Sequence, residues 1–424
     1  MRFTRNNSSK LPLIQTIKHN GYLQFFGPAI IVSVAYMDPG NFGTDISGGA
    51  IYEYKLLWVV WLANLMAMLL QYLSGKIGIA TGKSLAMLVA EKLKSRKKII
   101  LYWLASETFA VATDLAEFLG VASALYLIFR IPLLIASWIA AFDVIVIFAL
   151  AGKRFRHIEL LITSLVSIIS FGYIYEILIT RPDYYRIVYH SLVPALTTNE
   201  ELFIAVGIIG ATVMPHALMV HSKLTKDKLK YNDDAEKQKL LRYHLYDTIL
   251  NFTLAGLVNV AIMVMAAAAF YRNGIHVATI DEAYMTLEPL FGIVASQVFA
   301  ITLLASGLSS STTGVLAGQV ILEDLLGSKI NPWIRRVIVR IINVIPTSIA
   351  ITLGYDPLSL LVYSQVILSM MIPLPLIPLV YFTNDKKIMS TYANRKITTI
   401  LSLISTTIII ALNAYLLLDF LHNF

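Results

Sequence analysis

The chain contains no cysteine and few charged residues, and both shortages exclude whole classes of protein. Without cysteine there is no disulfide and no thiolate metal site, so any metal must be held by oxygen, imidazole or thioether groups. Only 14% of the 424 residues are charged, whereas soluble domains have about 25%. With 57% hydrophobic residues and a mean hydropathy of +0.70, the composition predicts an all-α polytopic membrane protein, with residues 1–424 forming a single transmembrane domain.

Apolar segments of about 20 residues or more predict membrane-spanning helices. The first apolar run has no small-residue cleavage site behind a short core, so we expect no cleavable signal. The eighth segment is longer than one span requires, which leaves room for a re-entrant or surface turn at its start. We expect eleven spans, the first and sixth of them broken: 22–51, 56–80, 99–122, 132–151, 158–179, 201–222, 244–271, 289–326, 333–353, 357–382 and 397–421.

The basic residues gather in alternate loops. Placing the N-terminus in the cytoplasm puts 28 of the 34 Lys and Arg residues in cytoplasmic segments, as the positive-inside rule requires. An odd number of spans then places the C-terminus outside a plasma membrane. The net charge of +8 follows the membrane, so we expect the lipid bilayer and no nucleic acid as a partner.

The first span contains the motif Asp38-Pro39-Gly40-Asn41. A carboxylate at this depth is costly and indicates a functional site. Pro39 removes a backbone donor and interrupts the helix, and Gly40 lets the chain turn freely. Such a break is tolerated only where it is buried in protein or lines a wet cavity. An acid, an amide and freed carbonyls gathered at one break predict a cation site; the alternative is a simple proline kink with an interfacial Asp.

The sixth span carries a second break within Ala211-Thr212-Val213-Met214-Pro215-His216. Breaks in spans one and six point to an inverted five-plus-five repeat whose broken helices face each other at the midplane. We expect repeat one over about 20–180, repeat two over about 200–383, and an eleventh helix over about 397–421.

Both breaks supply candidate metal ligands: Asp38, Asn41, the carbonyl of Ala211 and the thioether of Met214. Hard oxygens suit Mg²⁺ and Ca²⁺, and a thioether favours softer transition metals. The alternative for Met214 is packing, the usual role of a methionine on a helix. Gln365 lies at a similar depth and either completes the shell or joins two helices by a hydrogen bond.

Titratable residues near these breaks suggest a proton route. His216 and His221 follow the second break, and His216 is favoured for a proton role over ligation, although hydrogen-bonded filler and an interfacial place for His221 remain alternatives. Glu107, Asp114 and Glu117 share one face of span three and must meet cations, water or protons. Candidate partners are Arg335 and Arg336. The alternative is a static ion-pair network.

Two further features receive less weight. The run from Ser309 to Thr313 indicates close helix packing. Asp45 lies two turns beyond Asp38, where it either draws cations into an outer vestibule or caps a helix at the interface.

Together these residues resemble the natural resistance-associated macrophage protein (Nramp) family of proton-coupled divalent metal transporters. The similarity covers about residues 20–420, and its carriers are the Asp38–Asn41 motif, the Ala211–His216 motif, the span-three acids and Ala305–Ser311. The resemblance implies a LeuT-type fold and import of Mn²⁺ and Fe²⁺ as substrate ions, with no cofactor and no enzymatic activity. It implies metal ligation by Asp38, Asn41, Ala211, Met214 and Gln365. It implies proton movement through Asp38, His216, Glu107, Asp114, Glu117, Arg335 and Arg336.

One departure and three alternatives stay open. The family usually has Asn after Met-Pro-His, where this chain has Ala217, which affects hydrogen bonding after the break. A Na⁺-coupled symporter of an organic solute fits the same fold, but a thioether beside oxygen ligands suits it poorly. An intramembrane metalloenzyme would need more histidines. A channel would differ from a carrier by uptake that does not saturate.

Overall fold

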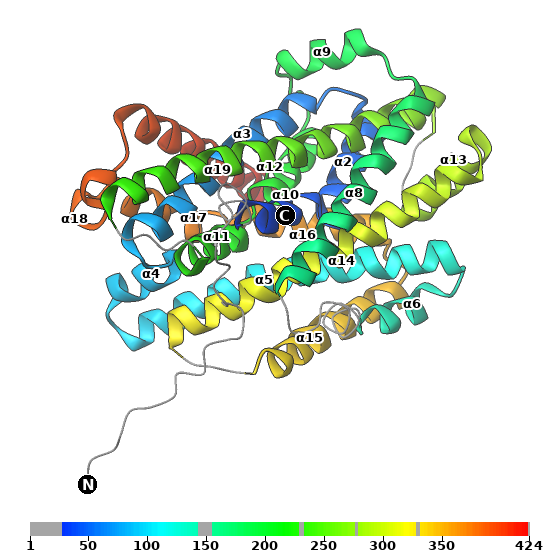
Figure 1. Ribbon diagram of the computed structural model, residues 1–424. Helices are drawn as coiled ribbons and strands as arrows, with labels where there is room; N and C mark the ends of the chain where they lie inside the picture. Colours follow the sequence, from blue (N-terminus) through cyan, green and yellow to red (C-terminus); the bar gives the residue numbers. More distant parts are fainter. Residues whose placement is uncertain (1–27, 143–154, 229–232, 276–278, 328–330, 423–424) are drawn as a thin grey trace.

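The computed structural model describes residues 28–142, 155–228, 233–275, 279–327 and 331–422 (Figure 1). Within these ranges every regular element is a helix. In chain order the elements are α1 (Pro28–Ser33), η2 (Val34–Met37), α2 (Pro39–Tyr52), α3 (Leu57–Thr81), α4 (Leu85–Leu93), α5 (Arg96–Phe129), α6 (Leu133–Ala140), α8 (Phe155–Thr180), α9 (Tyr184–Leu192), α10 (Asn199–Val213), α11 (Pro215–Lys228), α12 (Asp234–Ala269), η3 (Tyr271–Asn273), α13 (Ile280–Phe291), α14 (Ile293–Leu326), α15 (Pro332–Thr352), α16 (Pro357–Met371), α17 (Pro373–Asn384), α18 (Lys386–Met389), η4 (Ser390–Tyr392) and α19 (Lys396–His422).

Eight helical segments in the described ranges are long and apolar enough to cross a membrane. They correspond to all the predicted spans except the first, fourth and ninth. The first is divided into α1, η2 and α2, and the ninth is α15, whose apolar part covers Val337–Thr352. Only α6 represents the fourth, because the rest of 132–151 lies beyond residue 142 and outside the described residues, as do residues 22–27 of the first. The prediction of a multi-pass membrane protein is confirmed.

Two predicted spans differ in detail from the structure. The segment 289–326 is two helices, because Gly292 takes φ 90° and ends α13 before α14 begins. Span ten is also interrupted, at Pro373, where α16 gives way to α17. Proline lacks the N–H that would continue the hydrogen-bond ladder. The sequence pattern predicted breaks in spans one and six only.

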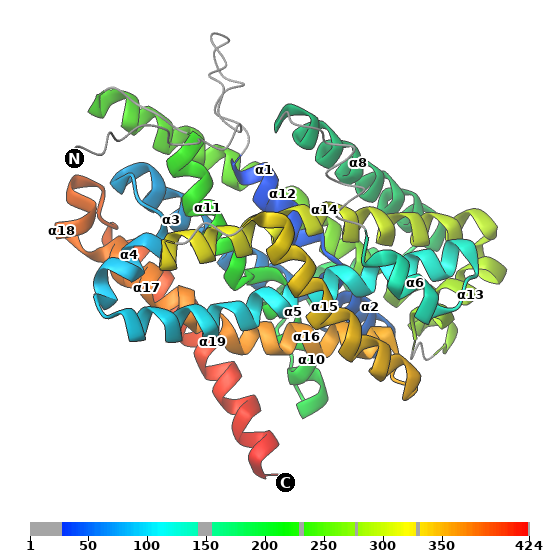
Figure 2. The ribbon, with the colours of Figure 1, turned by 90° about the horizontal axis from the view of Figure 1, so that it is seen from below.

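The broken helices lie inside the bundle. Helix α2 packs against α12, α10, α16 and α5, and α5 runs beside α14 in both views (Figures 1 and 2). Figure 2 also shows α19 extending beyond the other helices at its C-terminal end. Gly120 of α5 permits the closest contact with the first break, since a Cβ there would lie 2.1 Å from Pro39 Cγ. Helix α5, which carries the three predicted acids, therefore touches the break directly.

Candidate functional site

The first break is built by a capping interaction. Asp38 has extended backbone angles (φ −82°, ψ 166°) and is the N-cap of α2, with Oδ1 accepting a hydrogen bond from the Asn41 backbone N–H at 2.8 Å. Pro39 occupies the first turn, where a missing N–H costs nothing. The N-terminal end of a helix carries partial positive charge, which favours a carboxylate. Asp38 is 1% exposed and lies within the protein.

The second break separates α10 from α11. Met214 takes φ 41° and ψ 100°, in the region that side chains other than glycine rarely adopt. Pro215 then begins α11. Met214 is 0% exposed, so its side chain lies inside the bundle at the junction. Strained backbone of this kind persists only where the surroundings fix it, and it gathers at functional sites.

The side chain of Asn41 joins the two breaks. Its Nδ2 donates to Asp38 Oδ1 at 2.8 Å and to the Ala211 carbonyl at 3.1 Å. Its Oδ1 accepts from Thr212 Oγ1 and from Asn259 Nδ2, both at 3.1 Å. The positive end of the amide thus lies between the Asp38 carboxylate and the freed carbonyl of Ala211. These are two of the oxygens that the resemblance assigns to a cation.

Gln365 of α16 closes the same space from another side. It is 0% exposed, and its Nε2 donates to Ser364 Oγ at 2.9 Å. A Cβ on Gly40 would lie 2.2 Å from that Nε2, so the amide packs directly on the glycine of the first break. Gln365 therefore lies against the first break, and its two predicted roles both stay predictions.

Two oxygens at this junction are buried without a hydrogen-bond partner, Asp38 Oδ2 and Gln365 Oε1. Buried polar atoms in proteins are nearly always paired, so each exception needs an explanation such as an ion or a water. A carboxylate, amide oxygens and a carbonyl are ligands for a divalent cation, and a thioether adds preference for softer metals. The donor set at the two breaks is suited to binding a dehydrated cation.

His216 connects the second break to α5. Its Nδ1 lies 3.0 Å from Thr113 Oγ1, and that hydroxyl donates to the Phe109 carbonyl at 2.9 Å. Because the hydroxyl proton is already used, the network assigns the proton to His216 Nδ1 and leaves Nε2 as an acceptor. Nε2 is buried and has no partner. A neutral imidazole with a free acceptor can take up a proton.

The three acids of α5 lie on the face that meets α14 and α15. Glu107 accepts from Trp103 Nε1 at 2.9 Å and pairs with Arg335 Nη2 at 2.7 Å. Asp114 Oδ2 accepts from Asn343 Nδ2 at 2.7 Å and lies 3.5 Å from Arg340 Nη1.

Glu117 is 1% exposed, one helical turn before Gly120. A Cβ at Gly314 would lie 2.6 Å from its Oε1, so the carboxyl rests against α14. The expected pairing of the acids with arginines is therefore correct for Arg335. The Arg336 side chain lies outside the described residues, and Arg340 is the arginine beside Asp114.

His221 belongs to a different group from His216. Its Nδ1 lies 3.0 Å from Gln71 Oε1, and Gln71 Nε2 donates to Tyr36 Oη at 2.6 Å. Tyr36 in turn donates to the Val213 carbonyl at 3.4 Å. His221 is 0% exposed and therefore lies inside the helix bundle. Its contacts run from α11 through α3 to the first break, and no hydrogen bond in the described part of the chain links it to α5.

Hydroxyl groups of α14 stabilise the interrupted first span. Ser306 Oγ donates to the Met37 carbonyl at 2.5 Å, and Thr313 Oγ1 donates to the Ile31 carbonyl at 3.0 Å. Both carbonyls lie in the segment just before the first break, and backbone carbonyls there must find their donors within the protein. The hydroxyl-rich part of α14 therefore does more than allow the close packing that the sequence indicated.

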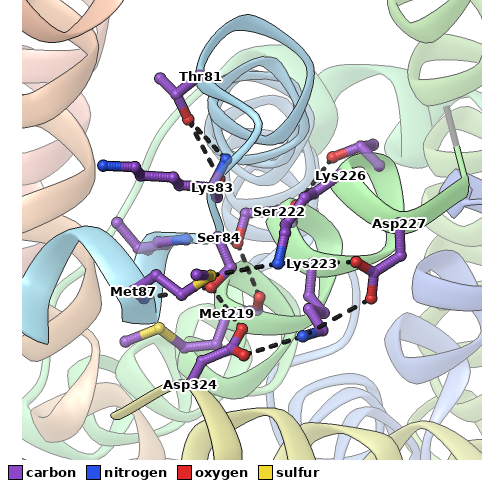
Figure 3. A network of polar contacts seen from close by, with 12 residues as sticks. Thr81, Lys83, Ser84, Met87, Met219, Ser222, Lys223, Lys226, Asp227 and Asp324 are labelled. Atoms are coloured by element: carbon purple, nitrogen blue, oxygen red, sulfur yellow. Dashed lines mark hydrogen bonds and ion pairs between the residues drawn. The ribbon is translucent and has the colours of Figure 1, made fainter. Parts of the chain in front are cut away.

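A second polar network closes the far end of α11 (Figure 3). Asp324 of α14 pairs with Lys223 Nζ at 2.9 Å and accepts from Ser84 Oγ at 2.6 Å. Ser222 Oγ accepts from the Leu85 backbone N–H at 2.9 Å. The network joins the helix after the second break to α4 and α14, so α11 cannot move away from them while it is intact.

Several of these contacts were not predicted from the sequence. Arg340, Asn343 and Thr113 carry polar side chains within apolar helices, and Arg336, Arg340 and Asn343 recur at four- and three-residue spacing. That spacing places them on one helical face and is the signal that could have found them. Thr212 and Asn259 gave no such signal.

The fold and the site define a polytopic membrane protein of the LeuT type, with two broken helices around a small polar centre. The model of the family "Natural resistance-associated macrophage protein-like" matches residues 29–419. The chain therefore belongs to the Nramp family, as the motifs indicated.

Proteins that are similar to this chain support the same family. The chain is 43% identical over 397 residues to "Divalent metal cation transporter MntH" of Verminephrobacter eiseniae, covering 94% of this chain and 89% of that protein. It is 40% identical to the protein of the same name from Bacillus subtilis, covering 94% and 93%. A crystal structure of the Eremococcus coleocola manganese transporter superposes with a TM-score of 0.86 at 29% identity, covering 96% of this chain and 89% of that one. MhsT, solved with L-phenylalanine, shares the fold alone, with a TM-score of 0.54 and 14% identity over 92% of this chain and 98% of that one.

Proposed function

We propose that this protein is a secondary active transporter that imports divalent transition-metal ions such as Mn²⁺ and Fe²⁺ in symport with protons, by alternating access. The observation that carries the proposal is the meeting of the two breaks. There Asp38 has an unpartnered Oδ2, Asn41 donates to the Ala211 carbonyl, and Gln365 packs on Gly40. Met214, at the second break, is the proposed thioether ligand. The printed names of the relatives, divalent metal cation and manganese transporters, support this substrate class.

Metal binding requires a local rearrangement. The Asn41 amide now satisfies Asp38 Oδ1 and the Ala211 carbonyl with its two protons. A cation in that place replaces the amide protons, and Asn41 then turns its oxygen toward the metal. Cation binding on Asp38 displaces a proton, and His216 with its free Nε2 can accept one. The hydrogen bond to Thr113, beside Asp114, offers a route toward α5.

Alternating access is proposed as movement of the half-helices at the breaks. The inner side stays closed while the Lys223–Asp324 pair and the Tyr36–Gln71–His221 contacts hold α11. In the proposed orientation the N-terminus is cytoplasmic, the C-terminus is outside, and the membrane is the plasma membrane. A membrane potential then favours cation uptake by about 2.3 kcal/mol per charge per 100 mV.

The test is Mn²⁺ uptake into proteoliposomes with internal pH recorded and Ca²⁺ and Mg²⁺ as competitors. We expect saturable uptake with internal acidification, little affected by either competitor. Asp38→Ala should abolish Mn²⁺ binding, whereas Asp114→Ala should uncouple proton movement more than it weakens binding. Uptake without acidification would refute symport and keep the metal site. No uptake by folded protein would favour a Na⁺-coupled organic solute instead, and uptake that does not saturate would indicate a channel.

A further inference from the structure

The short helix α9 carries an exposed apolar face. Its large side chains are between 49% and 80% exposed and share one side of the helix: Tyr184, Tyr185, Val188, Tyr189 and Leu192. A contiguous apolar patch on a protein surface marks an interaction site. The face therefore needs a partner, and the surroundings of α9 indicate which one.

The remaining surface of α9 is held by the protein. Arg186 forms an ion pair with Glu53, and Ser191 Oγ accepts a hydrogen bond from Trp61 Nε1 at 3.1 Å. Ile187 packs against the hydrophobic core beside α3. These contacts fix the rotation of α9, so its apolar face points away from the bundle. Figure 1 shows α9 at the edge of the molecule.

The position of α9 in the chain places it at a membrane surface. It follows the span Thr163–Thr180 and precedes the span that begins at Asn199, so it lies where both spans leave the membrane. Trp58 and Trp61 in the first turns of α3 lie beside this segment, and Trp58 Nε1 donates to the Ala195 carbonyl at 3.3 Å. Tryptophan and tyrosine are enriched at membrane–water interfaces. The aromatic residues therefore put α9 at the level of the lipid headgroups.

The apolar face also continues the lipid-facing surface of α8. Phe171, Ile174 and Leu178 are exposed and recur at three- and four-residue spacing, which places them on one side of this span. Exposed apolar side chains of a membrane span contact lipid. Only residues 181–183 separate α8 from α9, so the lipid that covers the end of α8 reaches the start of α9.

We propose that α9 is a membrane-surface helix whose apolar face enters the boundary between lipid headgroups and acyl chains. A helix with aromatic and aliphatic residues on one face and polar residues on the other lies in this plane, with its apolar face buried by about 5–10 Å. The tyrosine rings enter the apolar layer while their hydroxyls stay among the headgroups. In the orientation proposed above the leaflet is the outer one. The inference does not depend on the transported ion or on proton symport.

The test places single spin labels on α9 of the full chain in proteoliposomes. Because the chain has no native cysteine, each of three variants carries one labelling site: Tyr185→Cys, Val188→Cys and Leu192→Cys. Collisions with oxygen, which dissolves in lipid, and with a water-soluble nickel chelate report the depth of each label. The reference for lipid is Phe171→Cys on the exposed side of α8, and the reference for water is Glu200→Cys, at an exposed acid in the first turn of α10.

The three α9 labels should collide with oxygen more than with the nickel chelate and report a depth of about 5–10 Å, between the two references. Nickel collisions as frequent as at Glu200→Cys would show that the face lies in water and would overturn the proposal. Shielding from both reagents would overturn it in favour of a protein contact, such as a second copy of this chain.

Hydrogen exchange in lipid nanodiscs gives a second test without a label. Val188→Asp places a carboxylate in the apolar face, and the matched control His190→Asp places one on the other side of the same helix. Both substitutions lower helix propensity alike, but only the first puts a charge into lipid. We expect the α9 amides to exchange about fivefold faster or more in Val188→Asp than in His190→Asp. Equal exchange in the two variants would count against insertion of this face.

Discussion

The contact between Gly40 and Gln365 provides a sharp test of the site geometry. In Gly40→Ala the new Cβ would lie 2.2 Å from Gln365 Nε2 and 2.3 Å from its Cδ, where carbon atoms normally stay about 3.5–4.0 Å apart. Gln365 is fully buried. The variant must therefore displace either the Gln365 amide or the first turn of α2.

The displacement lowers the free energy of unfolding through the contacts that it disturbs. Overpacking of a core costs about 1–3 kcal/mol, and loss of the Gln365–Ser364 hydrogen bond adds about 1 kcal/mol. The higher helix propensity of alanine offsets about 1 kcal/mol of this destabilisation. We expect a net destabilisation of about 1–3 kcal/mol, with weaker Mn²⁺ binding because Gln365 leaves the proposed metal site.

The assay is a double-mutant cycle with Gln365→Ala, using thermal unfolding in detergent and Mn²⁺ titration calorimetry. With the Gln365 side chain removed, the clash disappears, so Gly40→Ala should cost almost nothing in that background. The coupling between the two positions should be about 1–3 kcal/mol. Equal destabilisation by Gly40→Ala in both backgrounds would refute the contact as the cause.

Three further predictions concern selectivity, gating and pH. Met214→Ala should allow Ca²⁺ or Mg²⁺ to compete better in uptake assays while Mn²⁺ transport persists in part; unchanged competition would contradict the role of the thioether. Asp324→Asn removes the partly buried pair with Lys223, worth about 1 kcal/mol, and should open the inner side more often. The chain has no native cysteine, so Thr225→Cys introduces a single thiol. Labelling of this thiol should be about fivefold faster with Asp324→Asn than without it. An unchanged rate would show that the Lys223–Asp324 pair does not hold the inner side closed. Burial raises the pKa of Asp356 to about 6, against hydrogen bonds that lower it. A raised pKa stabilises the fold at low pH, and this contribution is lost as pH rises through about 6. Partial exposure limits the effect to about 1 kcal/mol. The pH dependence of thermal unfolding between about pH 4 and 7 should be flatter in Asp356→Asn than in wild type. The same pH dependence in both proteins would contradict this role of Asp356.

The positions of the breaks could be predicted because their causes are local. An intramembrane acid followed by proline marks the first, and Met214-Pro215 marks the second, whatever surrounds them. Pro373 interrupts span ten for the same local reason, but no polar residue beside it indicated a functional break. Eight of the eleven predicted spans, those found as long apolar helices in the described residues, followed from apolar length in the same way.

The partners within the site could not be predicted, because they depend on how separate helices are rotated and placed. The sequence offered Arg335 and Arg336 for the acids of α5, whereas Asp114 meets Arg340 and Asn343. The link between His216 and Thr113 joins residues 103 positions apart. Nothing in their spacing specifies such a contact, since it forms only when α5 and α11 pack.

The pairing of the acids suggests how direction could be built into proton movement. Glu107 and Asp114 are held by arginines of α15, so protonating either one in this conformation would break an ion pair. Asp38 Oδ2 has no such partner. In the symport proposed above, a proton displaced from Asp38 therefore passes the acids of α5 only when their pairs with α15 loosen. Because α15 packs on α5, the same movement that separates these helices would release the proton, which ties its exit to a change of conformation.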